Sequence, residues 1–123
     1  MSPIVDEDVA WIYAAATTAA GSEDVARDVT VSVAAAGERR RRAGRAVSRT
    51  QLVAEAVRLA VRLEPAPEIA DLPGFEREVI SLARFARLDV RQIASQCACS
   101  TVEVRQAMSD GLRRLARVEY AEC

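Results

Sequence analysis

Residues 89–118 read DVRQIASQCACSTVEVRQAMSDGLRRLARV, and this stretch decides the fold. It contains two capping-box patterns, Asp89-Val-Arg-Gln92 and Ser100-Thr-Val-Glu103, each typical of a helix start. Apolar residues follow both patterns at helical spacing. They are Ile93, Ala94 and Cys97 after the first, and Val104, Met108, Leu112, Leu115 and Val118 after the second. Only residues 98–100 separate the two helices, so the stretch predicts a helix-turn-helix.

In such a unit the second helix points its first turns into the major groove of DNA, and the first helix lies against the phosphates. Thr101, Arg105 and Gln106 lie off the apolar stripe, and Arg and Gln side chains suit guanine and adenine edges. The other predicted DNA contacts are Ser100, Arg91, Gln92, Arg113 and Arg114. The alternative is that these polar residues are only the solvated face of an amphipathic helix, and periodicity does not separate the two interpretations.

Helical patterns also fill residues 1–63. Acidic residues at 6–8 suit the first turn of a helix over 6–20. Ser22 can cap a second helix that runs to about Ala36, before Gly37. A third helix starts near Ser48 and has its apolar stripe at Leu52, Val53, Ala56, Leu59, Ala60 and Leu63.

Two prolines in residues 64–67 end this third helix and predict a linker and turn over 64–74. A short helix at 68–71 and a helix from Phe75 to about Arg87 follow. We therefore expect an all-α protein of two small helical halves, residues 1–63 and a helix-turn-helix domain at 68–120.

The charges are unevenly distributed along the chain. Residues 1–36 hold six acids and one base, whereas residues 37–49 hold six arginines and one acid. These arginines are Arg39, Arg40, Arg41, Arg42, Arg45 and Arg49. Flanking glycines, Gly37 and Gly44, predict a loop or a frayed helix end here. The run is a candidate contact patch for DNA or an acidic protein, or else a solvated loop.

The composition argues against catalysis. The chain has no histidine, which removes the commonest general base and the commonest metal ligand, and no Gly-rich phosphate loop. Its three cysteines are too few for a four-thiolate zinc site. We predict no enzyme, no cofactor, no metal and no small-molecule substrate. Cys97 and Cys99 fit small buried apolar residues better than a redox pair.

The sequence also has no stretch long and apolar enough to span a membrane, and no signal-peptide pattern. Few cysteines fit a reducing compartment. We therefore predict a cytoplasmic protein that does not bind membranes.

Five segments together resemble region four of bacterial sigma factors, in the small extracytoplasmic-function branch. They are Leu72-Pro73, Arg77-Glu78-Val79, the apolar stretch Leu82 to Leu88, Ile93-Ala94 and Val104. The resemblance covers residues 68–118 and implies a module that binds the upstream promoter element as part of RNA polymerase.

A second resemblance lies upstream. Trp11-Ile-Tyr13 and the segment from Gly21 to Val29 look like the part of sigma region two that grips the polymerase clamp. It implies polymerase contacts at Glu23, Asp24, Arg27 and Asp28, with the helix at 48–63 as a remnant of the segment that melts promoter DNA.

The chain departs from the family within its second helix. Arg105 keeps a basic position and Gln106 replaces a serine, but Ala107 and Asp110 stand where arginine is usual, and Glu103 stands at a threonine position. Two hypotheses follow. The protein is a sigma-like regulator that contacts promoter DNA, RNA polymerase or both, or it is a degenerate sigma mimic. Such a mimic would bind an anti-sigma protein, polymerase or another regulator, with little DNA binding of its own.

Overall fold

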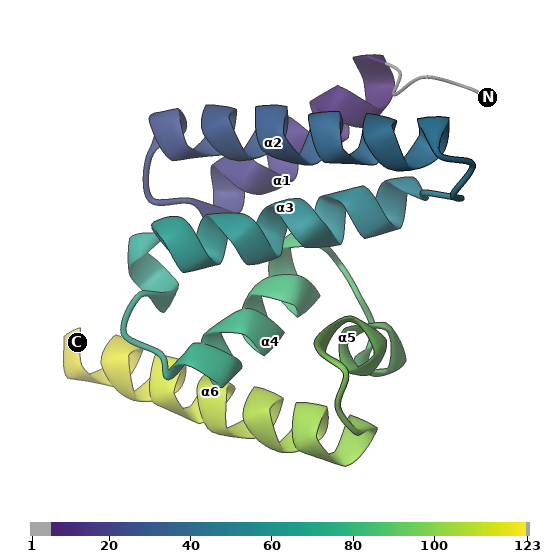
Figure 1. Cartoon of the computed structure of the whole chain (residues 1–123). Helices are drawn as coiled ribbons and strands as arrows, with labels where there is room; N and C mark the ends of the chain where they lie inside the picture. Colours follow the sequence, from purple (N-terminus) through teal and green to yellow (C-terminus); the bar gives the residue numbers. More distant parts are fainter. Residues whose placement is uncertain (1–5, 123) are drawn as a thin grey trace.

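A computed structural model of the chain describes the backbone of residues 6–122 and the side chains of residues 7–117 (Figure 1). The described residues form six α-helices, one short 3₁₀ helix and no strand, which confirms the all-α class. The elements are α1 (Asp6–Ala19), α2 (Glu23–Arg42), α3 (Arg49–Leu63), η1 (Pro67–Ile69), α4 (Gly74–Phe85), α5 (Val90–Cys97) and α6 (Thr101–Glu122).

The predicted starts of α2 and α3 are confirmed. The Ser22 hydroxyl accepts a hydrogen bond from the Val25 amide at 3.3 Å, and the Ser48 hydroxyl accepts one from the Gln51 amide at 3.1 Å. Each bond satisfies one of the amides that a helix start leaves without an intrahelical partner.

The predicted end of α2 is wrong. The helix does not stop at Ala36 but continues through a buried Gly37 to Arg42, so most of the arginine run is helical rather than a loop. Arg42 bonds Glu38 one turn earlier at 2.7 Å, and the Arg40 guanidinium bonds both Glu55 oxygens at 2.6 Å. Arginines also suit the negative end of a helix dipole. The chain turns only after Ala43, where Gly44 has a φ of +84°.

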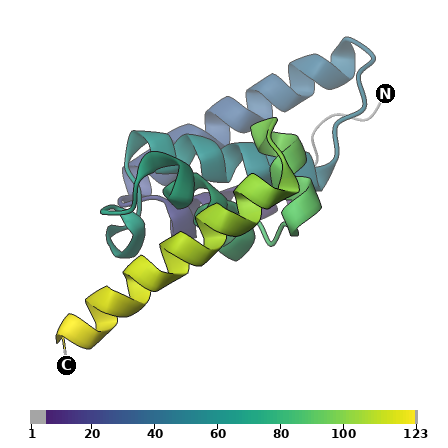
Figure 2. The ribbon, with the colours of Figure 1, turned by 90° about the horizontal axis from the view of Figure 1, so that it is seen from below.

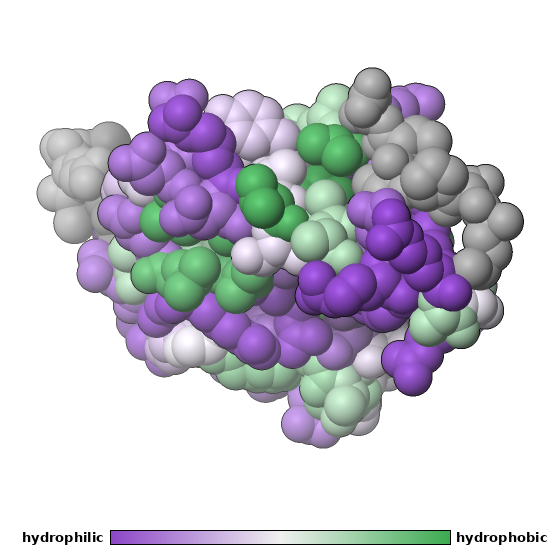
Figure 3. Space-filling model, turned by 45° about the horizontal axis from the view of Figure 1, so that its top comes forward, coloured by the Kyte–Doolittle hydropathy of each residue, from purple (hydrophilic) through white to green (hydrophobic). Residues whose placement is uncertain are grey.

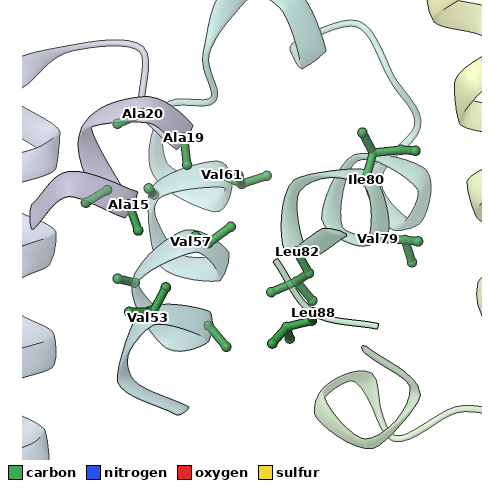
Figure 4. Close-up of a cluster of buried hydrophobic side chains, with 14 of the residues drawn as sticks. Ala15, Ala19, Ala20, Val53, Val57, Val61, Val79, Ile80, Leu82 and Leu88 are labelled. Atoms are coloured by element: carbon green, nitrogen blue, oxygen red, sulfur yellow. The ribbon is translucent and has the colours of Figure 1, made fainter. Parts of the chain in front are cut away.

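Helix α3 lies at the centre of the molecule, between α1 and α2 on one side and α4 on the other (Figure 1). Burial therefore extends beyond the single stripe predicted for it. Ala54, Val57 and Val61 are buried although the stripe omitted them, and Leu63, which the stripe included, is 60% exposed. Figure 4 shows Val53, Val57 and Val61 of α3 between the alanines of α1 and Leu82 of α4.

The segment predicted as a linker, residues 64–74, is packed against the rest of the chain. The Gly21 amide donates to the Glu64 carbonyl at 2.6 Å, and the Ala66 amide donates to the Ala19 carbonyl at 2.9 Å. A Cβ atom on Gly21 would lie 2.8 Å from the Pro65 carbonyl oxygen, so this approach requires glycine. The segment's buried side chains, Ala66, Ile69 and Leu72, join the core.

Two further predicted boundaries are corrected. The short helix expected at 68–71 is a 3₁₀ helix, Pro67–Ile69, with Pro67 at its start. Helix α4 ends at Phe85 rather than at Arg87. Arg87 takes a left-handed φ of +56°, and the Leu88 amide bonds the Leu82 carbonyl at 3.1 Å, which closes the turn and buries Leu88.

Helix α6 packs across α4 through its smallest residues. The predicted stripe placed Leu112 inward, but Leu112 is 56% exposed, whereas Ala107 and Gly111 are buried. A Cβ atom on Gly111 would lie 2.9 Å from Cγ1 of Ile80. The close approach of the two helices therefore rotates the buried face of α6 toward its small residues. Of the stripe, Val104 is confirmed as buried, Met108 and Leu115 are half-buried, and Val118 lies outside the described side chains.

We predict that Gly111→Ala destabilises the protein by about 1 kcal/mol, although alanine is the better helix former. Overpacking against Ile80 costs roughly 1–3 kcal/mol, which exceeds a propensity gain of about 1 kcal/mol. Urea unfolding followed by circular dichroism measures the change. The control is Leu112→Ala, one residue away and exposed, which should change stability by less than about 0.5 kcal/mol. A Gly111→Ala variant more stable than the wild type would contradict the packing argument.

Candidate nucleic-acid interface

Two complete capping boxes build the α5–α6 unit. The Asp89 carboxylate accepts from the Gln92 amide at 2.8 Å, and Oε1 of Gln92 accepts from the Asp89 amide at 2.9 Å. The Ser100 hydroxyl accepts from the Glu103 amide at 3.1 Å, and Oε1 of Glu103 accepts from the Ser100 amide at 3.3 Å. Both helix starts are therefore as the sequence predicts, and Glu103 has a structural role in the second.

The turn between the helices is a Schellman motif. Ala98 takes the left-handed conformation, with φ 53° and ψ 47°. The Cys99 amide donates to the Ala94 carbonyl at 3.0 Å and the Ala98 amide to the Ser95 carbonyl at 3.4 Å, as this motif requires. Ile93 of α5 and Val104 of α6 are fully buried in the core.

Ala98→Gly should stabilise the protein by about 1 kcal/mol, because an alanine Cβ is strained in a left-handed conformation and glycine is not. Thermal or urea unfolding measures the gain. The matched control is Ala116→Gly, an exposed position inside α6, where glycine should cost about 1 kcal/mol. Destabilisation by both substitutions would refute the assigned turn geometry.

The first turns of α6 are accessible. Figure 2 shows α6 in front of the other helices, with none of them covering it. Seven of the eight predicted DNA contacts are exposed and Thr101 is half-exposed. The exposed ones are Arg91, Gln92, Ser100, Arg105, Gln106, Arg113 and Arg114. Residues 84–117 contain seven arginines but only three carboxylates, so this region is basic although the whole chain has a net charge of −1.

Neighbouring carboxylates engage three of the predicted contacts. Asp110 accepts hydrogen bonds from Gln106 at 3.0 Å and from Arg113 at 2.9 Å. The Arg114 Nε atom lies 2.9 Å from Oε2 of Glu76, an ion pair whose angles do not make a hydrogen bond. These side chains must exchange partners before they can reach a phosphate or a base.

Arg91 and Arg105 differ from those three. Both are exposed, and the described part of the chain offers neither guanidinium a carboxylate or a hydrogen-bond partner. Of the three carboxylates in this region, Asp89 and Glu103 bond backbone amides in the capping boxes. Two unpaired cations therefore remain on the face that the sequence predicts for DNA.

Ala107 does not belong to this face. Its side chain is 6% exposed and lies one turn before Gly111, which approaches Ile80 of α4. A long basic side chain at this position would have to displace that packing. The absence of arginine here follows from how closely α6 approaches α4.

The predicted basic patch is largely paired within the protein. Arg40 bonds Glu55, Arg42 bonds Glu38, and Arg41 donates to the Val47 carbonyl at 2.8 Å. Arg39 and Arg45 are exposed. Figure 3 shows strongly hydrophilic side chains over the end of the molecule where α2 ends. Arg40 and Arg41 therefore join α2 to its neighbours, and contact of the patch with a partner stays a prediction.

Asp8 is the buried acid of this network, with 6% of its surface exposed. Its Oδ1 accepts from Nε of Arg49 at 2.9 Å, and its Oδ2 lies 3.4 Å from the Arg41 guanidinium. The Arg49 hydrogen bond, opposed by desolvation and helped by the charges of both arginines, lowers the pKa of Asp8 below its usual value. Arg49 also lies over the Trp11 ring, 5.6 Å from its centroid, and 3.3 Å from Glu7.

Because its folded-state pKa is depressed, Asp8 stabilises the protein above its unfolded pKa, and this contribution is lost as the pH falls through the folded pKa. We expect Asp8→Asn to cost about 2 kcal/mol at neutral pH, as for a partly buried charged hydrogen bond. The difference from the wild type should shrink as the pH falls below about 4. Urea unfolding at several pH values measures it, with exposed Asp28→Asn as the control. A difference that does not vary with pH would refute the ionic role.

The acidic residues predicted to contact polymerase lie at the start of α2. Glu23, Asp24, Arg27 and Asp28 are all exposed. Arg27 bonds Asp24 at 3.1 Å, and the Tyr13 hydroxyl donates to Glu23 at 3.3 Å. Val31, one turn further along α2, is 70% exposed. The structure brings these residues to one surface helix, separate from the α5–α6 unit.

The two internal cysteines are half-buried and unbonded. Burial, and then the charge of Glu78, raises the pKa of the Cys97 thiol. A raised pKa lowers the fraction of reactive thiolate. The thiol therefore suits packing better than oxidant sensing.

Sequence reasoning missed a groove between α1, the start of α3 and the α4–α5 turn. Its volume is about 460 Å³. The groove residues are Trp11, Ala14, Ala15, Thr18, Arg49, Thr50, Val53, Arg84, Phe85, Ala86, Arg87 and Gln92. The only signal in the sequence is the pair Arg84 and Arg87, which flanks Phe85. This pair does not indicate that α1, α3, α4 and α5 meet at one groove.

None of the described helices is long and apolar enough to cross a membrane. Within the described part of the chain, no three His, Cys, Asp or Glu residues cluster closely enough to hold a metal ion. Comparison of the chain with protein-family models, curated proteins and solved structures found no match.

Proposed function

We propose that this protein is a sigma-like transcription regulator whose α5–α6 unit docks on promoter DNA. One observation carries the proposal. An unpaired Arg105 stands beside Thr101 and Gln106 on the uncovered first turns of a capped helix that a tight turn joins to α5. This is the arrangement by which helix-turn-helix proteins present side chains to base edges.

Each part of the unit has a role in the proposed complex. The first turns of α6 enter the major groove, where the Arg105 guanidinium can bond a guanine bidentately and Thr101 can contact a thymine methyl. The start of α5 lies against the backbone, where Arg91 reaches a phosphate. Because Glu103 bonds the Ser100 amide and hydroxyl, the capping box fixes this carboxylate at the helix start.

The proposed complex is weak without a partner. DNA affinity at physiological salt grows with the number of phosphates that cationic side chains neutralise. Here Asp110 engages Arg113, and Glu76 engages Arg114, so only Arg91 and Arg105 of the four arginines predicted to contact DNA are unpaired among the described residues. We propose that RNA polymerase core supplies the remaining contacts through the exposed acidic start of α2.

The second candidate is a sigma mimic that binds only proteins. Val102, which is 70% exposed on the first turn of α6, favours it, because a large exposed apolar side chain suits a protein interface. In this alternative the α5–α6 unit keeps the fold of a DNA reader, but its affinity for DNA is negligible and does not change with salt.

Selection from a pool of random 20-base-pair duplexes, followed by fluorescence anisotropy at several salt concentrations, tests DNA binding by the full chain. We expect Arg105→Ala to weaken binding by about tenfold or more, since one bidentate base contact contributes roughly 1–3 kcal/mol. Arg91→Ala should reduce the salt slope by about one unit. The control is Arg27→Ala on α2.

Recovery of no duplex, or equal binding by the wild type and Arg105→Ala, would exclude the DNA-binding proposal. Co-purification of polymerase core or an anti-sigma protein with the chain would then support the mimic. Substituting Glu23 and Asp24 by glutamine and asparagine should reduce that co-purification if the start of α2 is the contact.

A further inference from the structure

We propose that the groove between α1, α3 and the α4–α5 turn binds an acidic, amphipathic peptide segment of a partner protein. The inference rests on the protein partner of the proposed function. It gives this partner a second contact, separate from the start of α2, and a chemistry. It involves neither the first turns of α6 nor Arg105, so it can be tested separately from DNA binding.

The lining of the groove has two kinds of surface. Trp11, which is 53% exposed, and half-buried Phe85 supply aromatic rings, with alanines and Val53 around them. Arg49, Arg84 and Arg87 supply the charge, and none of the described carboxylates lines the groove. A ligand that complements both kinds of surface must carry an apolar side chain with negative charges next to it.

Two of these three arginines are free to bind a negatively charged ligand. Arg49 already bonds Asp8 and Glu7, but Arg84 and Arg87 are exposed and have no ion pair with described residues. Arg84 lies over the Phe85 ring, 5.7 Å from its centroid. Arg40 and Arg58, by contrast, each bond a carboxylate. The structure therefore leaves unpaired cations where an aromatic surface is also open.

The backbone conformation of Arg87 also supports a role for its side chain. Its φ of +56° is a conformation that glycine adopts without strain and arginine does not. Strained backbone conformations cluster at functional sites, where the surrounding structure holds them in place. Here the Arg87 side chain lines the groove, which places its guanidinium where an anionic partner can reach it.

The shape and chemistry favour a peptide. The volume of about 460 Å³ is within the usual range for ligand sites, but the groove is open and would leave much of a small ligand in water. Duplex DNA would bring phosphates to the arginines but no apolar group to Trp11 and Phe85. A peptide brings both, because carboxylates pair bidentately with guanidinium and an aliphatic or aromatic side chain packs on the rings.

Selection on the full chain from a displayed library of random twelve-residue peptides tests the proposal, with the double variant Arg84→Gln, Arg87→Gly for counter-selection. Recovered sequences should combine Asp or Glu with a large apolar residue. Trp11 is the single tryptophan of the chain, so its fluorescence reports binding of the best peptide directly. The affinity should fall as salt rises, and at least tenfold when the peptide's Glu residues become Gln.

Arg87→Gly separates binding from folding, because it removes the strain together with the guanidinium. It should be as stable as the wild type or more so, and should bind the peptide at least tenfold more weakly. Arg84→Gln should also weaken binding, whereas exposed Arg39→Gln on α2, outside the groove, should not. Arg105→Ala should bind the peptide normally, so failure of DNA binding leaves this test intact.

Four results would overturn the proposal. They are recovery of no peptide, recovery of peptides without acidic residues, equal binding by wild type and Arg87→Gly, and tighter binding of adenosine monophosphate or inorganic phosphate than of the best peptide. The last result would assign the groove to a small anion. Loss of DNA binding in Arg87→Gly, with no peptide recovered, would assign its arginines to the DNA interface.

Discussion

The burial of α3 on more than one side is the constraint on which the rest of the structure depends. Its side chains Val53, Val57 and Val61 pack between α1 and α4, so the first three helices and the last three share one core (Figure 4). Small residues make this possible, since alanine and valine let helices approach closely. A small residue also allows close packing where Gly111 of α6 meets Ile80 of α4. The position of the α5–α6 unit relative to α1 follows from these two contacts.

Charge pairing then decides which arginines remain available. The arginines at the end of α2 and the start of α3 bond acids of α1, α2 and α3, with Asp8 at the centre of the network. Those after α4 mostly have no such partner, because few acids follow residue 84 and two of them cap helices. A chain with almost no net charge thus has a basic region after residue 83, and both proposed interfaces include arginines of this region.

The two proposed interfaces share an element without sharing the residues tested. Gln92 belongs to the capping box of α5 and also lines the groove, so a peptide there lies against the first turn of the helix proposed to contact phosphates. Arg105 lies on α6 and Arg87 in the α4–α5 turn. This separation lets DNA binding and partner binding be measured independently.

The sequence by itself determined the helical class, most helix starts and the turn at 98–100, because capping residues and glycine or proline act on the backbone next to them. Only the tertiary structure decided that α2 continues to Arg42, that Leu63 and Leu112 face water and that Ala107 is buried. Those outcomes depend on helices distant in sequence. The groove is the extreme case, since no local pattern shows that Trp11 and Arg87 line one surface.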